Sequence, residues 1–246
     1  MPLSGFEPKT IYEDKDVLVI DKPAGLIVHA DGKTTEPTLV DWILDSYPEM
    51  KDVGEPAIQR PGLGEILRPG LVHRLDKDTS GVMIIAKNQK SHAFLKKQFQ
   101  DRKIEKKYLA LVWGSFREEG GVINKPIGKS AKDFRLRSAE KGARGELRDA
   151  ETHWQVVEKL GDYTLLSVTP KTGRTHQIRV HMKAIGHPVV CDKLYAQNKT
   201  CPVGELSRQA LHAESLTVKL PSGERKTFNA SVPGDFKSLL EELRAL

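Results

Sequence analysis

A polar segment at residues 73–81, HRLDKDTSG, combines a central carboxylate, Asp76, with basic and hydroxyl side chains. The apolar run that follows it at 82–86 has the length and branching of a buried strand. Because catalytic groups are commonly presented on loops held by rigid strands, this segment predicts a site in which Asp76 acts as a nucleophile or a base. For an Asp taken alone, hydrogen bonding to the backbone of its own turn is the more common role.

Basic side chains are concentrated in two further segments of a chain whose net charge is +6. Residues 90–107 hold seven Lys and Arg against two acidic residues, and residues 125–148 hold eight against three, so each segment carries +5. This concentration is typical of a surface that binds a polyanion. Two solvated charged faces would give the same pattern, and charge alone favours neither interpretation.

The composition is ordinary for a globular protein: 246 residues, 38% hydrophobic and 29% charged. No run approaches the roughly 18 consecutive apolar residues of a membrane helix, and the N-terminal MPLSGFEPKT has no features of a signal peptide. The two cysteines, Cys191 and Cys201, indicate no disulfide framework and are expected to be free thiols. We therefore expect a cytoplasmic protein without membrane association.

Predicted strands and helices alternate irregularly along the first half of the chain. Apolar runs predict strands at 17–20 and 26–29. Thr38 is a typical N-cap for a short helix, and Ser91 is expected to cap the next one. Residues 51–70 are rich in proline and glycine, which predicts an irregular loop.

The second half continues the same irregular order. Strands are predicted at 108–113 and 163–168, a basic surface element or hairpin at 120–148, and a helix at 175–185 with one face on the core. A hairpin and a last helix follow. Such interleaving of strands and helices predicts an α+β fold with a mixed or largely antiparallel sheet.

Segment 73–81 is similar to the active-site motif of the RluA family of pseudouridine synthases, in which H-R-L-D is followed by Lys or Arg and then by x-T-S-G. Asp76 stands where that family has its catalytic aspartate. Other segments resemble further family blocks in the same order: DVLVIDKPAGLIVHA at 16–30, EKKYLALVWG at 105–114, KTGRTHQIRVHMKAIGHPVVCDKLY at 171–195 and RQALHAESLTV at 208–218. The resemblance covers most of the chain.

The resemblance implies the pseudouridine synthase catalytic fold: a long, mixed, mostly antiparallel sheet with flanking helices and a central RNA-binding cleft. Residues 1–246 would form this single domain, because the first strand begins near Thr10 and leaves no room for the N-terminal S4 domain that many members carry. The implied activity is isomerisation of specific uridines in structured RNA to pseudouridine. This reaction is redox-neutral, so no cofactor and no metal are expected, and we expect a monomer.

The resemblance also assigns the catalytic residues. Asp76 is the catalyst, and Arg179 is its ion-pair partner, which would favour the ionised carboxylate. Tyr108 would stack on the target uracil near the proton on carbon 5, whereas without the resemblance a strand tyrosine packed in the core would be the favoured interpretation. The target base must be flipped out of its stack. Arg74 would then fill the vacated space or contact a phosphate.

Six basic residues are expected to contact RNA: Arg74, Lys129, Lys132, Arg135, Arg137 and Arg174. Arg174 lies in a Gly-Arg-Thr sequence before the predicted helix, where backbone N–H groups could meet a phosphate. The resemblance favours large-subunit ribosomal RNA as the substrate. Transfer RNA is the alternative, because members that modify it share these motifs.

Other motifs and functions carry less weight. Gly128-Lys129-Ser130 resembles the end of a P-loop, but Ile123 occupies the position of the required glycine. The spacing of His and Cys residues matches no zinc motif. Cys191 departs from the family, which usually has glycine there. A noncatalytic RNA-binding or ribosome-assembly protein on the same scaffold is the alternative function, and a glycosidic hydrolase would need a second carboxylate that does not stand out.

Overall fold

The computed structural model describes residues 7–30, 34–55, 58–60, 64–131, 133, 136–139, 143–202 and 206–246. The chain divides into two compact units. The first comprises Met1–Glu105 and Ser215–Ser231, and the second comprises Lys106–Glu214 and Val232–Leu246. No helix within the described ranges is long and apolar enough to cross a membrane.

An antiparallel sheet forms the centre of the first unit. Strands β1 (Lys9–Glu13), β2 (Val17–Lys22) and β5 (Ser80–Ala86) are hydrogen-bonded in that order, and β2 and β5 are mostly buried. Every residue of β5 is buried, which explains its continuous apolar sequence. The predicted hairpin is confirmed as β13 (Leu211–Lys219), of which Ser215 onward belongs to this unit, paired with β14 (Arg225–Asn229).

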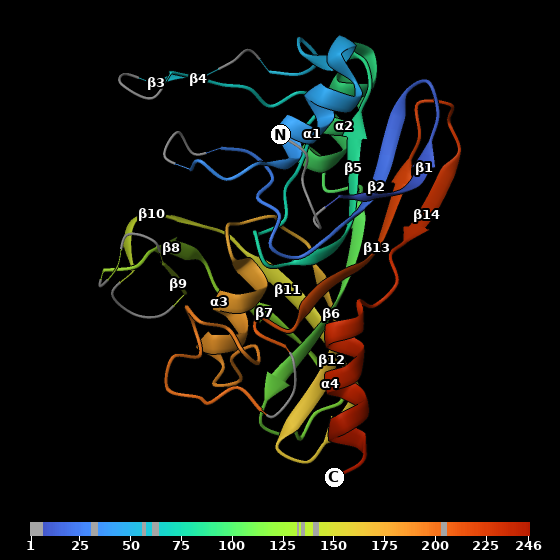
Figure 1. Ribbon diagram of the computed structural model, residues 1–246. Coiled ribbons are helices and arrows are strands. Elements are labelled where there is room, and N and C mark those ends of the chain that lie inside the picture. The colour runs from blue at the N-terminus through green and yellow to red at the C-terminus, as the bar shows by residue number, and fades with distance from the viewer. Residues whose placement is uncertain are drawn as a thin grey trace. The chain divides into compact units, whose positions relative to one another are not determined.

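The first unit contains helices α1 (Leu39–Ser46) and α2 (Gln89–Gln100) (Figure 1), and each begins at a capping residue. Helix α1 has the predicted N-cap, because Thr38 and Asp41 form a reciprocal capping box. Helix α2 begins earlier than predicted. Its N-cap is Asn88, which has an extended backbone and accepts the N–H of Ser91 at 2.9 Å, so Ser91 is the capped residue and not the cap.

Two sequence predictions in the first unit need correction. Residues 26–29 form no strand: only Ile27 makes a bridge, to Thr38, because the carbonyls of this segment accept N–H groups at the start of α1. The predicted irregular loop at 51–70 contains a short hairpin of β3 (Ile58–Arg60) and β4 (Gly64–Ile66). A single 3-10 turn, η1 (Pro48–Met50), precedes it.

The second unit contains a larger antiparallel sheet in the order β6 (Glu105–Trp113), β12 (Tyr163–Pro170), β11 (Glu151–Leu160) and β7 (Gly120–Asn124). A small sheet has the order β10 (Arg144–Arg148), β8 (Ile127–Lys129) and β9 (Arg137–Ser138). The basic element predicted at 120–148 is therefore divided: β7 joins the larger sheet, and the rest forms the small one. The α+β class with a mostly antiparallel sheet is confirmed.

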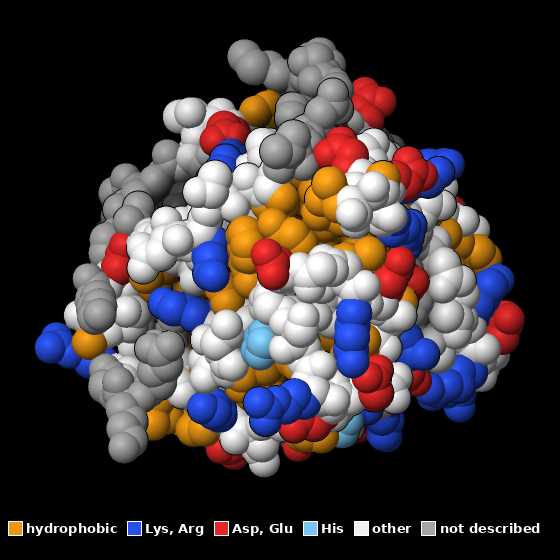
Figure 2. Space-filling view, turned by 90° about the horizontal axis from the view of Figure 1, so that it is seen from below, with side chains coloured by type: hydrophobic (Ala, Val, Ile, Leu, Met, Phe, Trp, Pro, Cys, Tyr) orange, Lys and Arg blue, Asp and Glu red, His pale blue; other side chains and the backbone are white. Residues whose placement is uncertain are grey.

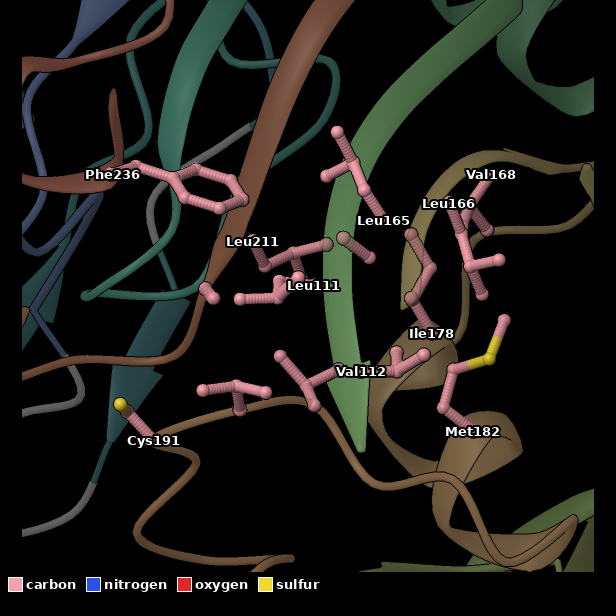
Figure 3. Close-up of a cluster of buried hydrophobic side chains, with 14 of the residues drawn as sticks. Leu111, Val112, Leu165, Leu166, Val168, Ile178, Met182, Cys191, Leu211 and Phe236 are labelled. Carbon is pink, nitrogen blue, oxygen red and sulfur yellow. The ribbon is translucent and has the colours of Figure 1, made fainter. Parts of the chain in front are cut away.

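Helices α3 (Gln177–Ala184) and α4 (Gly234–Arg244) complete the core of the second unit. Figure 3 shows Ile178 and Met182 of α3 in one cluster with Val112 of β6 and Phe236 of α4. The helix predicted at 175–185 is thus confirmed, but more of it is buried than one face. All six residues from Gln177 to Met182 are buried.

The prediction of free thiols is wrong, because Cys191 and Cys201 form a disulfide. The chain between them turns back and places their Cα atoms 4.8 Å apart, within the range that a disulfide spans. Cys191 has a φ of 57°, in the left-handed region. Glycine adopts this backbone conformation without strain, whereas a residue with a side chain rarely does.

Candidate active site

Asp76 lies on a turn that leads directly into β5. The N–H of Thr79 donates to the carbonyl of Asp76 at 3.2 Å, and β5 begins at the next residue, Ser80. Thr79 and Ser80 are buried, whereas Asp76 is half-buried. The turn therefore fixes the backbone of Asp76 and leaves part of its side chain accessible.

Lys22, at the end of β2, anchors this turn from below. Its side chain is fully buried, and Nζ donates to the carbonyls of Pro23 at 2.7 Å, Leu26 at 2.9 Å and Lys77 at 3.0 Å. The N–H of Gly25 donates to the same Lys77 carbonyl at 2.9 Å. A buried ammonium needs such bonds to offset its lost hydration. The carbonyl of Lys77, the residue after Asp76, thus accepts two hydrogen bonds. The sequence at 16–30 resembled a family block, but it did not predict this role for Lys22.

His73 has the structural role expected from its place at the start of the motif. Its Nε2 accepts the N–H of Ile84 in β5 at 3.0 Å. Its ring stacks on Phe99 of α2, with 4.7 Å between the centroids. These contacts fix the loop between strand and helix.

Arg74 is exposed and points toward the segment at 26–30. Its Nη1 donates to Nε2 of His29 at 2.9 Å, and Nδ1 of His29 lies 2.9 Å from the carbonyl of Ala30. Because a guanidinium only donates, Nε2 must accept and Nδ1 must carry the hydrogen. His29 is therefore neutral in this arrangement.

Arg179 lies in the second unit, on α3, and is almost completely buried at 4% exposure. Its Nε and Nη2 donate to the two carboxylate oxygens of Asp192 at 2.7 and 2.8 Å. This parallel pair of bonds is the strongest geometry for an arginine and a carboxylate. Asp192 was not singled out in the sequence, although it follows the unusual Cys191.

Tyr195 brings two of the predicted residues together. The guanidinium of Arg179 lies over its ring, 5.0 Å from the centroid, and its hydroxyl accepts the backbone N–H of Arg137 at 3.0 Å. The same hydroxyl lies within hydrogen-bonding distance, 2.8 Å, of Nδ1 of His176. Asp192 also accepts the backbone N–H of Tyr195 at 3.1 Å. Sequence reasoning missed Asp192 and Tyr195 because neither has a role without its partners.

Tyr108 is half-buried on β6 and stands opposite Val168 of β12. It packs against the hydrophobic cluster of the second unit. Tyr108 therefore makes the packing contacts expected of a tyrosine on a strand. A tyrosine in this state can still offer one ring face to a ligand, because its side chain is not fully enclosed.

The small sheet carries a row of cations. Lys129 on the central strand β8 stands opposite Arg137 on β9 and opposite Arg144 on β10. Like charges placed directly opposite one another destabilise a sheet, so a bound polyanion would relieve this arrangement. Two of the residues predicted to contact RNA, Lys132 and Arg135, lie outside the described residues.

Arg174 lies in the loop before α3, where its Nε donates to the carbonyl of Asp149 at 3.0 Å.

Basic residues on the face drawn in Figure 2 do not gather in one patch. Figure 2 shows a face on which Lys and Arg side chains are interspersed with acidic ones around a group of hydrophobic side chains.

The histidines and cysteines form structural contacts. In the part of the chain that the structure describes, no group of three or more His, Cys, Asp or Glu side chains could hold a metal ion. His181, for example, lies within hydrogen-bonding distance of Thr152 and of the Lys125 carbonyl, 2.9 Å in each case. Burial lowers the pKa of this imidazole below its ordinary value.

Residues 16–184 match the family described as RNA pseudouridylate synthase. The chain is 38% identical over 234 residues to the uncharacterized RNA pseudouridine synthase YlyB of Bacillus subtilis, with 95% of this chain and 72% of that protein covered. It is 40% identical over 245 residues to the ribosomal large subunit pseudouridine synthase D of Xanthomonas campestris, with 95% and 69% covered.

A solved structure, human RNA pseudouridylate synthase domain containing 4, has the same fold. Its TM-score is 0.72 at 24% sequence identity, and the match covers 96% of this chain and 93% of that one. The family match extends over both the Asp76 turn and the whole of the helix that carries Arg179. The chain belongs to the RNA pseudouridylate synthase family, whose members are isomerases that act on RNA.

Proposed function

We propose that this protein converts specific uridines in structured RNA to pseudouridine with Asp76 as the catalytic carboxylate. The observation that carries the proposal is the Asp76 turn: a family motif with a half-exposed carboxylate, anchored by buried Lys22 and by the start of β5. In the reaction, the bond from ribose carbon 1′ to uracil nitrogen 1 breaks and a bond to carbon 5 forms. Carbon 5 loses a proton and nitrogen 1 gains one, so the product is an isomer.

Asp76 would attack the sugar or base as a nucleophile, or remove a ribose proton as a base. Arg179 would orient the Asp76 carboxylate, as the family resemblance implies. The Asp192 pair supports this role, because it fixes the orientation of the Arg179 guanidinium. A guanidinium held along one edge has little freedom to move away from a second partner.

Tyr108 would stack on the flipped uracil and receive or relay the carbon 5 proton. Arg74 would occupy the space that the uracil leaves in the RNA stack. Its exposure supports this role, since a residue that enters an RNA helix must reach beyond the protein surface.

The substrate we favour is large-subunit ribosomal RNA, because relatives from Nitrosomonas europaea and Xanthomonas campestris are named ribosomal large subunit pseudouridine synthase D. Contacts to its phosphates would come from the following residues: Arg74, Lys129, Lys132, Arg135, Arg137 and Arg174. Transfer RNA is the second substrate class to test.

The protein would act as a monomer in the cytoplasm, where ribosomal RNA is modified. The Cys191–Cys201 disulfide is unusual for that compartment. A thiol assay on protein purified without reductant would therefore show whether the bond exists in solution.

The test of this function is to incubate the purified protein with unmodified total RNA and to map pseudouridine along every transcript. Pseudouridine at one or a few sites of large-subunit ribosomal RNA is the expected result. Binding without any modification would instead indicate a noncatalytic RNA-binding or assembly protein. Release of free uracil would indicate a glycosidic hydrolase.

A further inference from the structure

Lys106, on β6, is a half-buried cation that has no acidic partner in the described part of the chain. Burial lowers the pKa of its ammonium to about 8. Among the residues described by the structure, it forms neither a hydrogen bond nor an ion pair. Exposed lysines of the same unit do find acids: Lys159 pairs with Glu119, and Lys237 with Glu241. A cation that is partly removed from water without an acid beside it is unfavourable unless a ligand supplies the missing charge.

The ammonium of Lys106 can be reached past Gly173. A Cβ built at Gly173 would lie 3.9 Å from Nζ of Lys106 and would meet no other atom within 4 Å. Gly173 is exposed, and its φ is outside the left-handed region. Its backbone conformation therefore does not require glycine, whereas a larger side chain there would cover the ammonium.

This opening belongs to the same unit as two of the proposed catalytic residues. Side chains two positions apart in a strand project from the same face, so Lys106 and Tyr108 share a face of β6 and stand about 7 Å apart along it. Gly173 lies in the loop that leads into α3, the helix that carries Arg179. An anion held by Lys106 would therefore lie beside a base stacked on Tyr108.

We propose that Lys106 and the adjacent backbone of Gly173 form a binding site for a phosphodiester group of the RNA, next to the uridine that stacks on Tyr108. The proposal rests on the proposed function for the identity of that RNA. A phosphodiester carries one negative charge, which balances one ammonium. Its oxygens accept up to three N–H bonds from Lys106, and the low polarity around the ammonium strengthens them.

The first experiment measures affinity for a large-subunit ribosomal RNA transcript against salt concentration. Lys106→Met keeps the length of the side chain and removes its charge, so it should weaken binding about tenfold and lower the salt slope by about 1. Lys106→Arg should restore most of the affinity. Lys237→Met, which removes an exposed charge on α4, is the matched control and should leave the slope unchanged. A wild-type slope in Lys106→Met would overturn the proposal.

The second experiment follows the pKa of Lys106 by NMR in protein labelled at the lysine ε-carbons. The value near 8 in the free protein should rise when the ribosomal RNA transcript is added, because a bound anion favours the charged amine. The same concentration of inorganic phosphate should have no effect. A rise with inorganic phosphate but not with the transcript, or no rise with either, would contradict the assignment to RNA.

Gly173→Leu provides a third arm, because the leucine side chain would cover the opening while Lys106 remains. It should reproduce the weaker binding of Lys106→Met, and unchanged affinity would contradict the proposed path to the ammonium. These results can be separated from the proposed function. A transcript that binds through Lys106 without being modified would refute the isomerase activity alone. A transcript that the wild type modifies, but that Lys106→Met binds with the wild-type affinity and salt slope, would refute the phosphate site alone.

Discussion

Lys22 in the first unit and Arg179 in the second are buried cations that are stabilised in different ways. Lys22 donates to three main-chain carbonyls, which carry no formal charge, and so fixes the shape of a loop. Arg179 donates along one edge to the carboxylate of Asp192, and so fixes the orientation of one side chain. The turn of Asp76 therefore depends on backbone geometry, whereas Arg179 depends on a second side chain.

The largest effect on stability is expected from breaking the Arg179–Asp192 pair. Asp192→Ala should destabilise the protein by about 3–5 kcal/mol, because it leaves a buried guanidinium without its carboxylate. The double variant Arg179→Met with Asp192→Leu should recover most of that loss, since it removes both charges of the pair. Urea denaturation of the three proteins measures both effects. A loss below about 1 kcal/mol in Asp192→Ala would mean that the pair does not hold Arg179.

A smaller loss is expected from Lys22→Met, which removes the donor from three carbonyls but also removes a buried charge. We expect about 2 kcal/mol of destabilisation, together with reduced activity because the Lys77 carbonyl loses one of its two donors. The control is Lys15→Met, in the same unit. Lys15 is exposed, so its replacement should change stability by less than about 0.5 kcal/mol. If Lys22→Met and Lys15→Met changed stability equally, Lys22 would not be what anchors the loop.

The cations of the small sheet in the second unit should be needed for RNA binding and not for stability. Replacing Lys129 and Arg137 with Gln should reduce the slope of log affinity against log salt by about 2, because each of the two cations is expected to neutralise one phosphate. The same charge change at Lys15 and Lys237 is the control. If both double variants give the wild-type slope, the row of cations is a solvated surface.

The smallest expected effect is on the pH dependence of stability, and it comes from His181, which lies on the same helix as Arg179. Burial lowers the pKa of His181 from its ordinary 6.5, so the unfolded state binds a proton more readily than the folded state. The stability that neutral His181 contributes is present above 6.5 and is lost as the pH falls through its lower folded value. His181→Gln should therefore lose less stability than the wild type between about pH 8 and about pH 5. An unchanged pH dependence would show that other groups cause it.

Features set by local sequence could be predicted. The apolar run at 82–86 predicts a buried strand, Thr38 predicts a helix start, and the spacing in 175–185 predicts a packed helix, because each signal lies within a few residues of the structure that it specifies. The motif at 73–81 placed Asp76 at a turn for the same reason. The hydrogen bond from Thr79 that closes this turn is local, whereas the anchoring by Lys22 comes from a distant segment.

Features that depend on distant segments could not be predicted. Residues 26–29 have strand composition, but their carbonyls accept N–H groups from the start of α1. Asp192 becomes a partner of Arg179 only when the chain folds back over 13 residues. Cys191 and Cys201 likewise meet only because the chain between them turns back. Local patterns carry no information about such contacts.

The central claim is that Asp76 performs the chemistry, and single-turnover pseudouridine formation by Asp76→Asn tests it most directly. The amide has the same shape as the carboxylate, so folding and affinity for the ribosomal RNA transcript should stay close to the wild type. It can neither act as a comparable nucleophile nor accept a proton at neutral pH, so we predict no pseudouridine above background. A rate of about one tenth of the wild type or more, a loss of at most about 1.4 kcal/mol in transition-state stabilisation, would contradict the account.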